Sequence, residues 1–248
     1  MSAHDRAAFL HEFVRAPFTV GAVAPSGEPL ADLITASVPR DGDPLVVELG
    51  PGTGAFTAAI QHRLGGRGHH LAIEVNERFA QRLATRYPQV DVAVADARDL
   101  REVLAERGRH RADVIVSGLP WAAFAPSRQH DLLDALTGAL APHGAFTTFA
   151  YTHTRWAPPA RRLRRSLGGR FEEVVVSRTV WANVPPAFVY FCRRPRVPAL
   201  AFDQRSIMAL RRKALPAVRP VGEDHRATPR AGMGKDARAL GIVRPPRD

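Results

Sequence analysis

Residues 46 to 54 read VVELGPGTG and decide how this chain folds. The first four residues suit a buried strand, and three glycines at alternate positions follow, Gly50, Gly52 and Gly54. Glycine lets the backbone turn tightly and lets a ligand approach with no Cβ in the way. An apolar stretch of helix-forming residues begins directly after Gly54. The stretch therefore predicts a strand, a ligand-binding turn and the start of a helix.

Outward from this turn, apolar runs alternate with helix-like stretches at the spacing of a parallel α/β sheet. The last two runs follow each other directly through Pro185 and Pro186, which favours an antiparallel hairpin at one edge. The expected fold is therefore α/β, with a seven-stranded Rossmann-like sheet. Its expected strands are 45–49, 70–74, 90–95, 113–117, 145–151, 171–180 and 187–192. Its expected helices are 56–64, 77–87, 100–107, 127–140 and 159–167.

The chain divides into three predicted parts. Residues 1–40 form an N-terminal extension that we expect to act as a lid, with an amphipathic helix at 5–15 and a second helix at 29–37. Residues 41–194 form the sheet domain. Residues 195–248 form a basic tail that we expect to be mostly disordered, apart from one helix at 206–215.

Composition excludes several classes of protein. The 248 residues are 45% apolar and include one cysteine, Cys192, so neither a disulfide framework nor a multi-thiolate metal site is possible within the chain. No stretch reaches the ~18 apolar residues of a membrane span, and the charged first residues do not resemble a signal peptide. We therefore expect a cytoplasmic, metal-free and monomeric protein.

Three acidic residues surround the predicted turn and indicate its ligand. Glu74 ends the second strand, where a carboxylate can accept two ribose hydroxyls, and Asp96 ends the third, where it can accept the amine of adenine. Glu48 would repel a pyrophosphate at the loop entrance but suits an ammonium group. Adenine, ribose and a cationic amino acid without phosphate describe S-adenosylmethionine. A nucleotide cofactor and a purely structural turn are the alternatives.

These residues resemble the seven-stranded S-adenosylmethionine-dependent methyltransferases, and the likeness covers residues 44–193. In that family the glycine loop and the acids after the second and third strands contact the methyl donor. The resemblance implies that the donor is bound by Glu48, Gly50, Gly52, Gly54, Glu74, Val75, Asp96 and Ala97, with Asn76 beside them.

The acceptor is expected after the fourth strand, where residues 117–121 read SGLPW. Amino methyltransferases often carry Asn/Asp-Pro-Pro-Tyr/Phe here, a polar group that accepts from the amine and a ring that faces it. We assign the polar role to Ser117, or to the backbone after it, and the aromatic role to Trp121. The alternative is that the Trp121 ring only packs the loop. Tyr151 offers a second aromatic face, and His153 two residues later is a candidate proton acceptor or an ordinary surface histidine.

Segments 9–26, 117–121 and 181–190 together resemble the soluble bacterial phospholipid N-methyltransferases, which methylate phosphatidylethanolamine stepwise toward phosphatidylcholine. The resemblance implies a phospholipid substrate at an anionic membrane surface and reversible membrane association. Candidate membrane contacts are the apolar face Phe9, Leu10, Phe13 and Val14 and the basic residues Arg161, Arg162, Arg164 and Arg165.

The same family is similar to the ribosomal RNA adenine dimethyltransferases, so methylation of ribosomal RNA or of another small amine is the alternative. The charge distribution weighs against it. Residues 193–248 carry 14 Arg or Lys against 5 Asp or Glu, whereas residues 1–192 carry 21 against 19. A nearly neutral body offers little general attraction for a polyanion, although the tail could still bind nucleic acid.

Overall fold

The computed structural model describes residues 27–196. Residues 1–26 and 197–248 lie outside the described residues, and with them the helices predicted at 5–15 and 206–215. Among the helices of residues 27–196, none combines the length and the apolar character needed to cross a bilayer.

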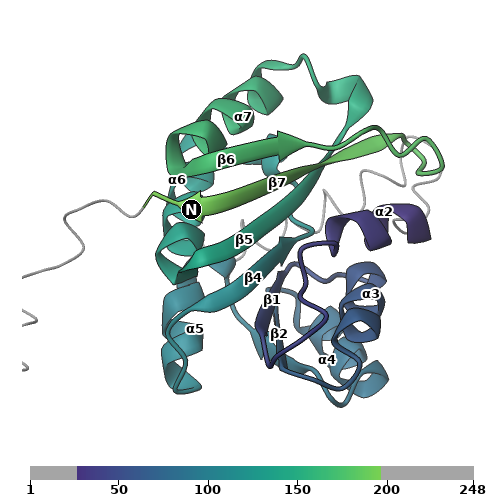
Figure 1. Ribbon diagram of the computed structural model, residues 1–248, viewed down its shortest axis with the longest axis vertical. Coiled ribbons are helices and arrows are strands. Elements are labelled where there is room, and N and C mark those ends of the chain that lie inside the picture. The colour runs from purple at the N-terminus through teal and green to yellow at the C-terminus, as the bar shows by residue number, and fades with distance from the viewer. Residues whose placement is uncertain (1–26, 197–248) are drawn as a thin grey trace, which may run out of the picture. The chain divides into compact units, whose positions relative to one another are not determined.

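The described chain builds a seven-stranded sheet in the order β3-β2-β1-β4-β5-β7-β6 (Figure 1). Strands β1 to β5 pair in parallel, and β7 pairs antiparallel with both β5 and β6. The predicted sheet and its antiparallel last pair are confirmed, with β6 at the edge. The strands are β1 (Leu45–Leu49), β2 (His69–Glu74), β3 (Asp91–Val94), β4 (Ala112–Ser117), β5 (Leu140–Tyr151), β6 (Phe171–Val176) and β7 (Ala187–Pro195).

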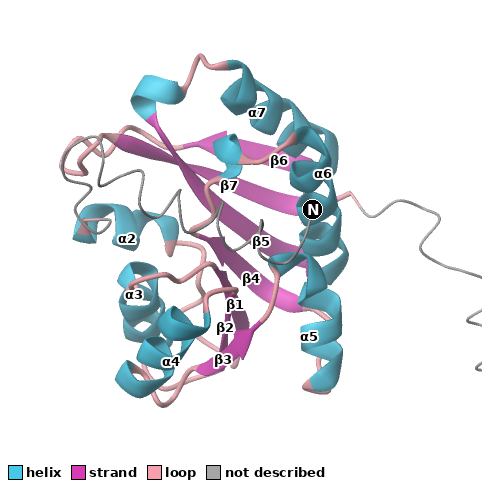
Figure 2. Cartoon of the chain, turned by 180° about the vertical axis from the view of Figure 1, so that it is seen from behind, coloured by secondary structure: helices cyan, strands magenta, loops and turns pink. Residues whose placement is uncertain are grey.

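Helices lie on both faces of this sheet (Figure 2). On one face, α5, α6 and α7 cover the larger apolar core; on the other, α2 and α3 cover a second core and α4 a small third one. The helices are α2 (Glu28–Ile34), α3 (Ala55–Leu64), α4 (Glu77–Arg86), α5 (Leu100–Glu106), α6 (Pro126–Ala139) and α7 (Pro158–Arg170). Three short 3₁₀ turns accompany them, η1 (Ala97–Asp99), η2 (Trp121–Ala123) and η3 (Thr152–Thr154).

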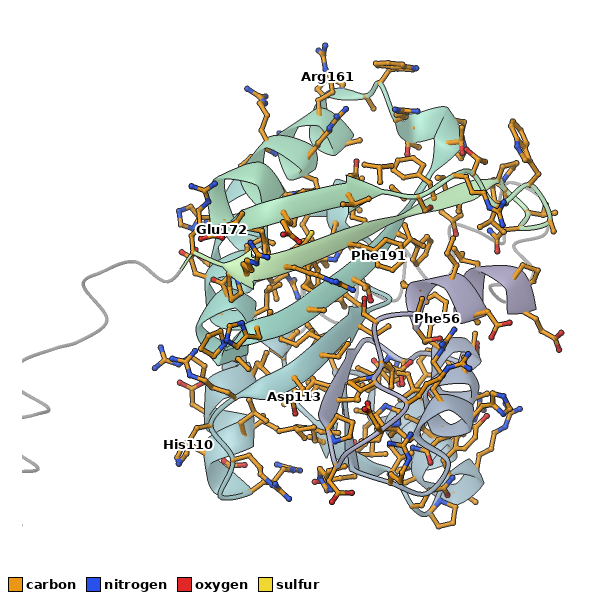
Figure 3. The ribbon with its side chains drawn as sticks, viewed as in Figure 1. Phe56, His110, Asp113, Arg161, Glu172 and Phe191 are labelled. Carbon is orange, nitrogen blue, oxygen red and sulfur yellow. The ribbon has the colours of Figure 1, made fainter. Side chains whose placement is uncertain are left out.

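Aromatic packing joins α3 to the middle of the sheet. Phe56, labelled in Figure 3, lies on the first turn of α3. Its ring meets that of Phe149 of β5 edge to face, with ring centroids 5.8 Å apart. Its side chain is 5% exposed, and burying a phenylalanine stabilises a fold by about 1.5–3 kcal/mol. This contact fixes the helix that begins directly after the glycine turn.

The strand order places a crevice at the carboxyl end of β1. Its two neighbours are β2 and β4. The connection that leaves β1 leads to β2 on one side and the connection that leaves β4 leads to β5 on the other, so the two diverge from that point. In open α/β sheets, ligands bind where the strand order reverses in this way. The turn at residues 50–54 and the loop after β4 both lie at this edge.

The largest differences from the predicted strand bounds are at β5 and β6. β5 begins at Leu140, directly after α6, instead of at residue 145. β6 ends at Val176 instead of at residue 180, because the hydroxyl of Ser177 accepts the Val189 N–H at 2.9 Å and replaces the next backbone acceptor of the ladder. The chain then leaves β7 and returns only at an isolated bridge, Val180 to Ala187.

Candidate active site

The three glycines of the turn all adopt left-handed backbone conformations, with φ of 68° at Gly50, 54° at Gly52 and 85° at Gly54. Two of them also pack closely. A Cβ on Gly50 would lie 2.7 Å from the Leu119 side chain, and one on Gly54 would lie 3.0 Å from Leu83. A Cβ on Gly52 would meet nothing within 4 Å. Gly52 therefore borders open space, whereas the other two glycines hold the turn against its neighbours.

Glu74 supports the turn from the end of β2. Its carboxylate accepts the Gly52 N–H at 3.1 Å with one oxygen and the Asn76 N–H at 2.9 Å with the other. The side chain is 3% exposed, and this burial raises the pKa of Glu74 above 4.5 although both N–H groups oppose the rise. Asn76 itself begins α4 as its N-cap and accepts the N–H groups of Arg78 and Phe79.

A small hollow lies where β2, β3 and β4 end. It measures about 20 Å³, which is room for roughly one water molecule. The predicted donor residues that line it are Gly50, Glu74, Val75, Asp96 and Ala97. Residues that the sequence did not indicate complete it: Ile73, Ala95, Leu119, Phe124, Arg128 and Leu132.

Asp96 is already paired in this hollow. Arg98 donates to it at 3.2 and 3.1 Å through Nε and Nη2, and Arg128 reaches it at 3.4 Å while its guanidinium lies 5.0 Å from the Phe124 ring centroid. Burial acts to raise the pKa of Asp96, but the arginines outweigh it and the pKa lies below 3.8. Asp96, expected to be a free acceptor for the adenine amine, is thus an ionised carboxylate that already accepts hydrogen bonds from two arginines.

Glu48 points away from the hollow, toward α3. Its Oε2 accepts the Thr57 hydroxyl at 2.7 Å and lies 3.2 Å from His70 Nε2, and Gln61 lies 2.9 Å from the other nitrogen of that ring. The carboxylate is fully buried, and its Oε1 has no hydrogen-bond partner within residues 27–196. Glu48 therefore fixes α3 to the sheet and keeps one buried acceptor oxygen unused.

The predicted roles of Ser117 and Trp121 need correction. The Trp121 ring is 2% exposed and packs in the core, edge to face with Phe146 at 5.8 Å and with Phe124 at 6.1 Å. Its indole N–H donates to the Ser117 hydroxyl at 3.0 Å, and Ser117 is fully buried. Neither side chain is placed to contact the amine that receives the methyl group, because the two bond each other inside the core.

The motif spacing points to Gly118 instead. In Asn/Asp-Pro-Pro-Tyr/Phe the polar residue stands three places before the ring, and three places before Trp121 stands Gly118, which has no side chain. A Cβ there would lie 2.7 Å from the Gly50 carbonyl oxygen, so the loop after β4 touches the glycine turn. Among residues 27–196, no N–H or hydroxyl donates to the Gly118 carbonyl. The backbone here is a free acceptor beside the turn.

Tyr151 and His153 lie together but apart from Trp121. Their rings stack with centroids 5.8 Å apart and planes 18° apart, and His153 is exposed. Tyr151 packs with Phe149 on the face that α2 and α3 cover, whereas Trp121 belongs to the core on the opposite face. Partial burial raises the pKa of Tyr151. The structure does not bring the two predicted aromatic walls together.

No group of three or more His, Cys, Asp or Glu side chains that could hold a metal occurs in the described range, 27–196. The geometry at the end of β1 thus combines a glycine turn, buried carboxylates and a free backbone acceptor.

Comparison with known proteins gives a consistent result. Residues 46–144 match a family model described as a methyltransferase domain. Ornithine lipid N-methyltransferase of Singulisphaera acidiphila is 34% identical over 188 residues, which cover 75% of this chain and 94% of that protein. Ribosomal RNA small subunit methyltransferase A of a Polaromonas species is 41% identical over 96 residues, which cover 38% of this chain and 27% of that protein.

Among solved structures, the 1,6-didemethyltoxoflavin-N1-methyltransferase of Burkholderia thailandensis has a TM-score of 0.54 at 17% identity. The likeness covers 78% of this chain and 91% of that one. At this identity it supports the fold alone.

Proposed function

Because the chain belongs to the S-adenosylmethionine-dependent class I methyltransferases and lies close to the lipid N-methyltransferases, we propose that it methylates the head-group amine of a membrane lipid. Phosphatidylethanolamine, converted toward phosphatidylcholine, is the first candidate substrate from the sequence. The head-group amine of an ornithine lipid is the second, supported by the relative that matches over 75% of this chain. We further propose that the protein works from the cytoplasm and associates reversibly with the membrane.

The residues present fit the methyl donor at the end of β1. The space in front of Gly52 is open and leaves room for a ligand. A larger side chain at this position would fill that space. Glu74 stands at the end of β2 with lone pairs for hydroxyl groups. When bound, S-adenosylmethionine supplies an activated methyl group on its sulfonium.

Arg128 narrows the proposed adenine site, because its long side chain reaches across the hollow to Asp96. We propose that Arg128 leaves Asp96 when the donor binds. Phe124 and Leu132 would then form apolar walls for the base.

The chain's own groups can prepare the amine. A primary ammonium has a pKa of ~10 and must lose a proton before it can attack. The Gly118 carbonyl, next to the glycine turn, is the acceptor we propose for one hydrogen of the amine. His153, exposed and stacked on Tyr151 at the end of β5, remains the candidate proton acceptor. These groups would position the amine, and positioning is a main contribution of a protein to such a transfer.

Parallel incubation with a labelled methyl donor tests the proposed function. The acceptors are liposomes that contain phosphatidylethanolamine, liposomes that contain an ornithine lipid, ribosomal RNA and free ethanolamine. We expect label in lipid and none in RNA. Label in RNA but in neither lipid would reject the lipid assignment and favour the ribosomal RNA alternative.

A further inference from the structure

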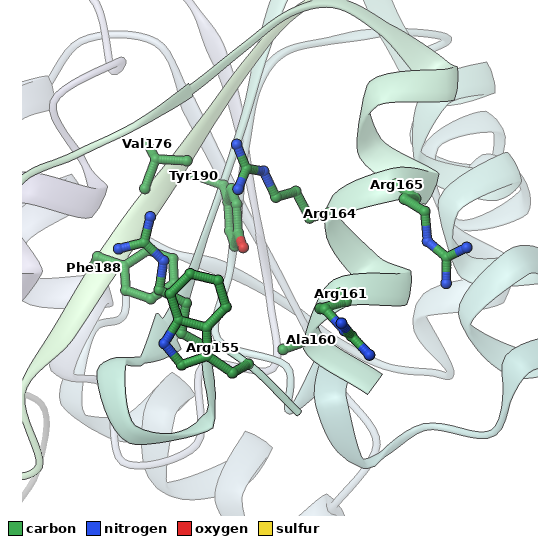
Figure 4. Close-up of a pocket in the computed structure, with 9 residues that line it drawn as sticks. Arg155, Ala160, Arg161, Arg164, Arg165, Val176, Phe188 and Tyr190 are labelled. Atoms are coloured by element: carbon green, nitrogen blue, oxygen red, sulfur yellow. The ribbon is translucent and has the colours of Figure 1, made fainter. Parts of the chain in front are cut away.

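A second and larger pocket lies near the edge strand β6, between α7 and the β6–β7 pair (Figure 4). Its volume is about 480 Å³, and none of the predicted donor residues lines it. Four arginines and three aromatic residues line it. The charged and aromatic lining is Arg155, Arg161, Arg164, Arg165, Trp156, Phe188 and Tyr190.

The four arginines of this pocket lack acidic partners. Within residues 27–196, none of them forms an ion pair or donates a side-chain hydrogen bond, and no carboxylate lines the pocket. Other arginines of the chain are paired, for example Arg107 with Asp91 at 2.7 Å and Arg170 with Asp134 at 2.8 Å. Four clustered guanidinium groups repel one another, so an anion between them removes a cost.

The hydroxyl of Tyr190 supplies a second, independent indication. Tyr190 of β7 is 3% exposed and packs edge to face on Phe188, with centroids 5.3 Å apart. Figure 4 shows its hydroxyl directed into the pocket, with Arg155 from the loop after β5 and Arg164 from α7 close by. Within the described part of the chain, this hydroxyl has no hydrogen-bond partner. It is a neutral donor that opens into the pocket and can bond an acceptor oxygen of a ligand.

One exposed aromatic residue lines the pocket, Trp156. Arg155 lies 5.4 Å from the Trp156 ring, and that indole is 75% exposed. An exposed indole beside an arginine is typical of surfaces at the lipid head-group level.

We propose that this pocket binds the phosphodiester of an anionic phospholipid at a bilayer surface, with Trp156 in the interface. Arginine forks match phosphate oxygens, and the Tyr190 hydroxyl adds a donor from below. The inference rests on the proposed function, because it assumes a lipid surface. Helix α7 also packs against η2, the turn after β4, so a lipid held here faces the edge of the sheet where the acceptor loop lies.

Vesicle cosedimentation without methyl donor tests the site. One arm uses phosphatidylcholine vesicles, and the other uses the same vesicles with phosphatidylglycerol added. We expect Arg161→Gln with Arg164→Gln to weaken binding to the anionic vesicles at least about tenfold. The matched control is Arg78→Gln with Arg82→Gln. These substitutions remove the same amount of charge from two exposed arginines of α4. The control should lose less than about threefold.

Tyr190→Phe distinguishes specific binding in the pocket from nonspecific electrostatic attraction to the vesicle surface. It removes one hydroxyl and no charge, and we expect about threefold to tenfold weaker binding to the anionic vesicles. Equal losses in the two double variants, together with an unchanged Tyr190→Phe variant, would overturn the proposal. A pocket variant that loses affinity for RNA or for glycerol 3-phosphate but keeps its vesicle binding would overturn it as well.

These outcomes are independent of catalysis. Methylation of lipid in uncharged detergent micelles reports the proposed function, and vesicle binding reports the pocket. A protein that methylates lipid in micelles but shows no pocket-dependent vesicle binding refutes only the pocket. Calorimetry with S-adenosylhomocysteine checks that each variant is folded.

Discussion

The Arg128 guanidinium lies 3.4 Å from an Asp96 carboxylate oxygen, although the two residues are 32 positions apart in the chain. The contact links the start of α6 to the end of β3, across the hollow that the sequence assigns to adenine. A partly buried pair of this kind must exchange partners when a base with its own amine enters. Breaking the ion pair costs free energy, and this cost lowers the affinity for the methyl donor.

We therefore expect Arg128→Ala to bind S-adenosylhomocysteine more tightly, by about threefold to tenfold. The variant removes the side chain that closes the hollow and leaves Arg98 to orient Asp96. Isothermal calorimetry measures the change, and Arg82→Ala, exposed on α4, is the control. Weaker binding by Arg128→Ala would mean that this guanidinium contacts the donor itself.

A pair of glycine substitutions tests the donor turn. Gly52 and Gly42 both have positive φ, 54° and 68°, and a Cβ on either would meet nothing within 4 Å. Gly52→Val and Gly42→Val should thus lose similar stability, about 1–2 kcal/mol from the left-handed backbone. Only Gly52→Val should abolish binding of S-adenosylhomocysteine. Retained affinity in a folded Gly52→Val protein contradicts the donor-site assignment.

Donor affinity should depend on the ionisation of Glu74. Burial raises the pKa of this carboxyl above 4.5, whereas the pKa values of Asp96 and Asp91 are lowered below 3.8 by their arginine partners, which outweigh burial. As the pH falls through the Glu74 pKa, the carboxylate loses acceptor capacity and affinity should drop. Glu74→Gln should bind weakly at every pH and lack this step in a calorimetric titration.

Stability should behave differently over the same range. Protonation relieves the desolvation of the Glu74 carboxylate, so this group does not destabilise the fold as the pH falls through its raised pKa. The paired carboxylates Asp91 and Asp96 lose their contribution only at lower pH, as it falls through their lowered pKa values. Loss of circular dichroism in step with the loss of affinity would contradict this assignment.

The buried contact of Glu48 with α3 gives a stability prediction. Thr57→Val keeps the shape of the side chain but removes the hydroxyl that donates to Glu48 at 2.7 Å. We expect the free energy of unfolding to fall by about 1–3 kcal/mol, because a buried carboxylate oxygen loses its donor. Thr85→Val is the matched control, since the Thr85 hydroxyl bonds only its own helix backbone on an exposed face of α4. Urea denaturation measures both variants, and equal losses would reject the role of the pair.

Periodicity and turn chemistry carried most of the fold. Alternating apolar runs predicted the seven strands, and the direct succession of the last two predicted their antiparallel pairing. The boundaries that failed depend on tertiary contacts, such as the Ser177 hydroxyl that ends β6 by bonding β7. No local pattern indicates such a contact in advance.

The site was predictable only in part for the same reason. Glycines with positive φ and acids at strand ends are local features, and five of the eight predicted donor residues line one hollow. The face on which a loop side chain packs is not a local feature. Trp121 follows β4 as predicted, but its indole has a hydrogen-bond partner four residues away and an aromatic core beneath it. Arg128 carries no local signal, because its partner lies on another element.

The position of β7 between β5 and β6 sets the order in which the chain can complete itself during synthesis. Strand β6 pairs with no strand but β7 in residues 27–196, so it gains a partner only after residues 187–195 have been made. Until then β5 keeps an open edge of unpaired backbone groups, which is a template for association with other chains. A nascent or truncated chain that ends before β7 should therefore aggregate or bind chaperones, even though every residue of the glycine turn and its carboxylates is already present.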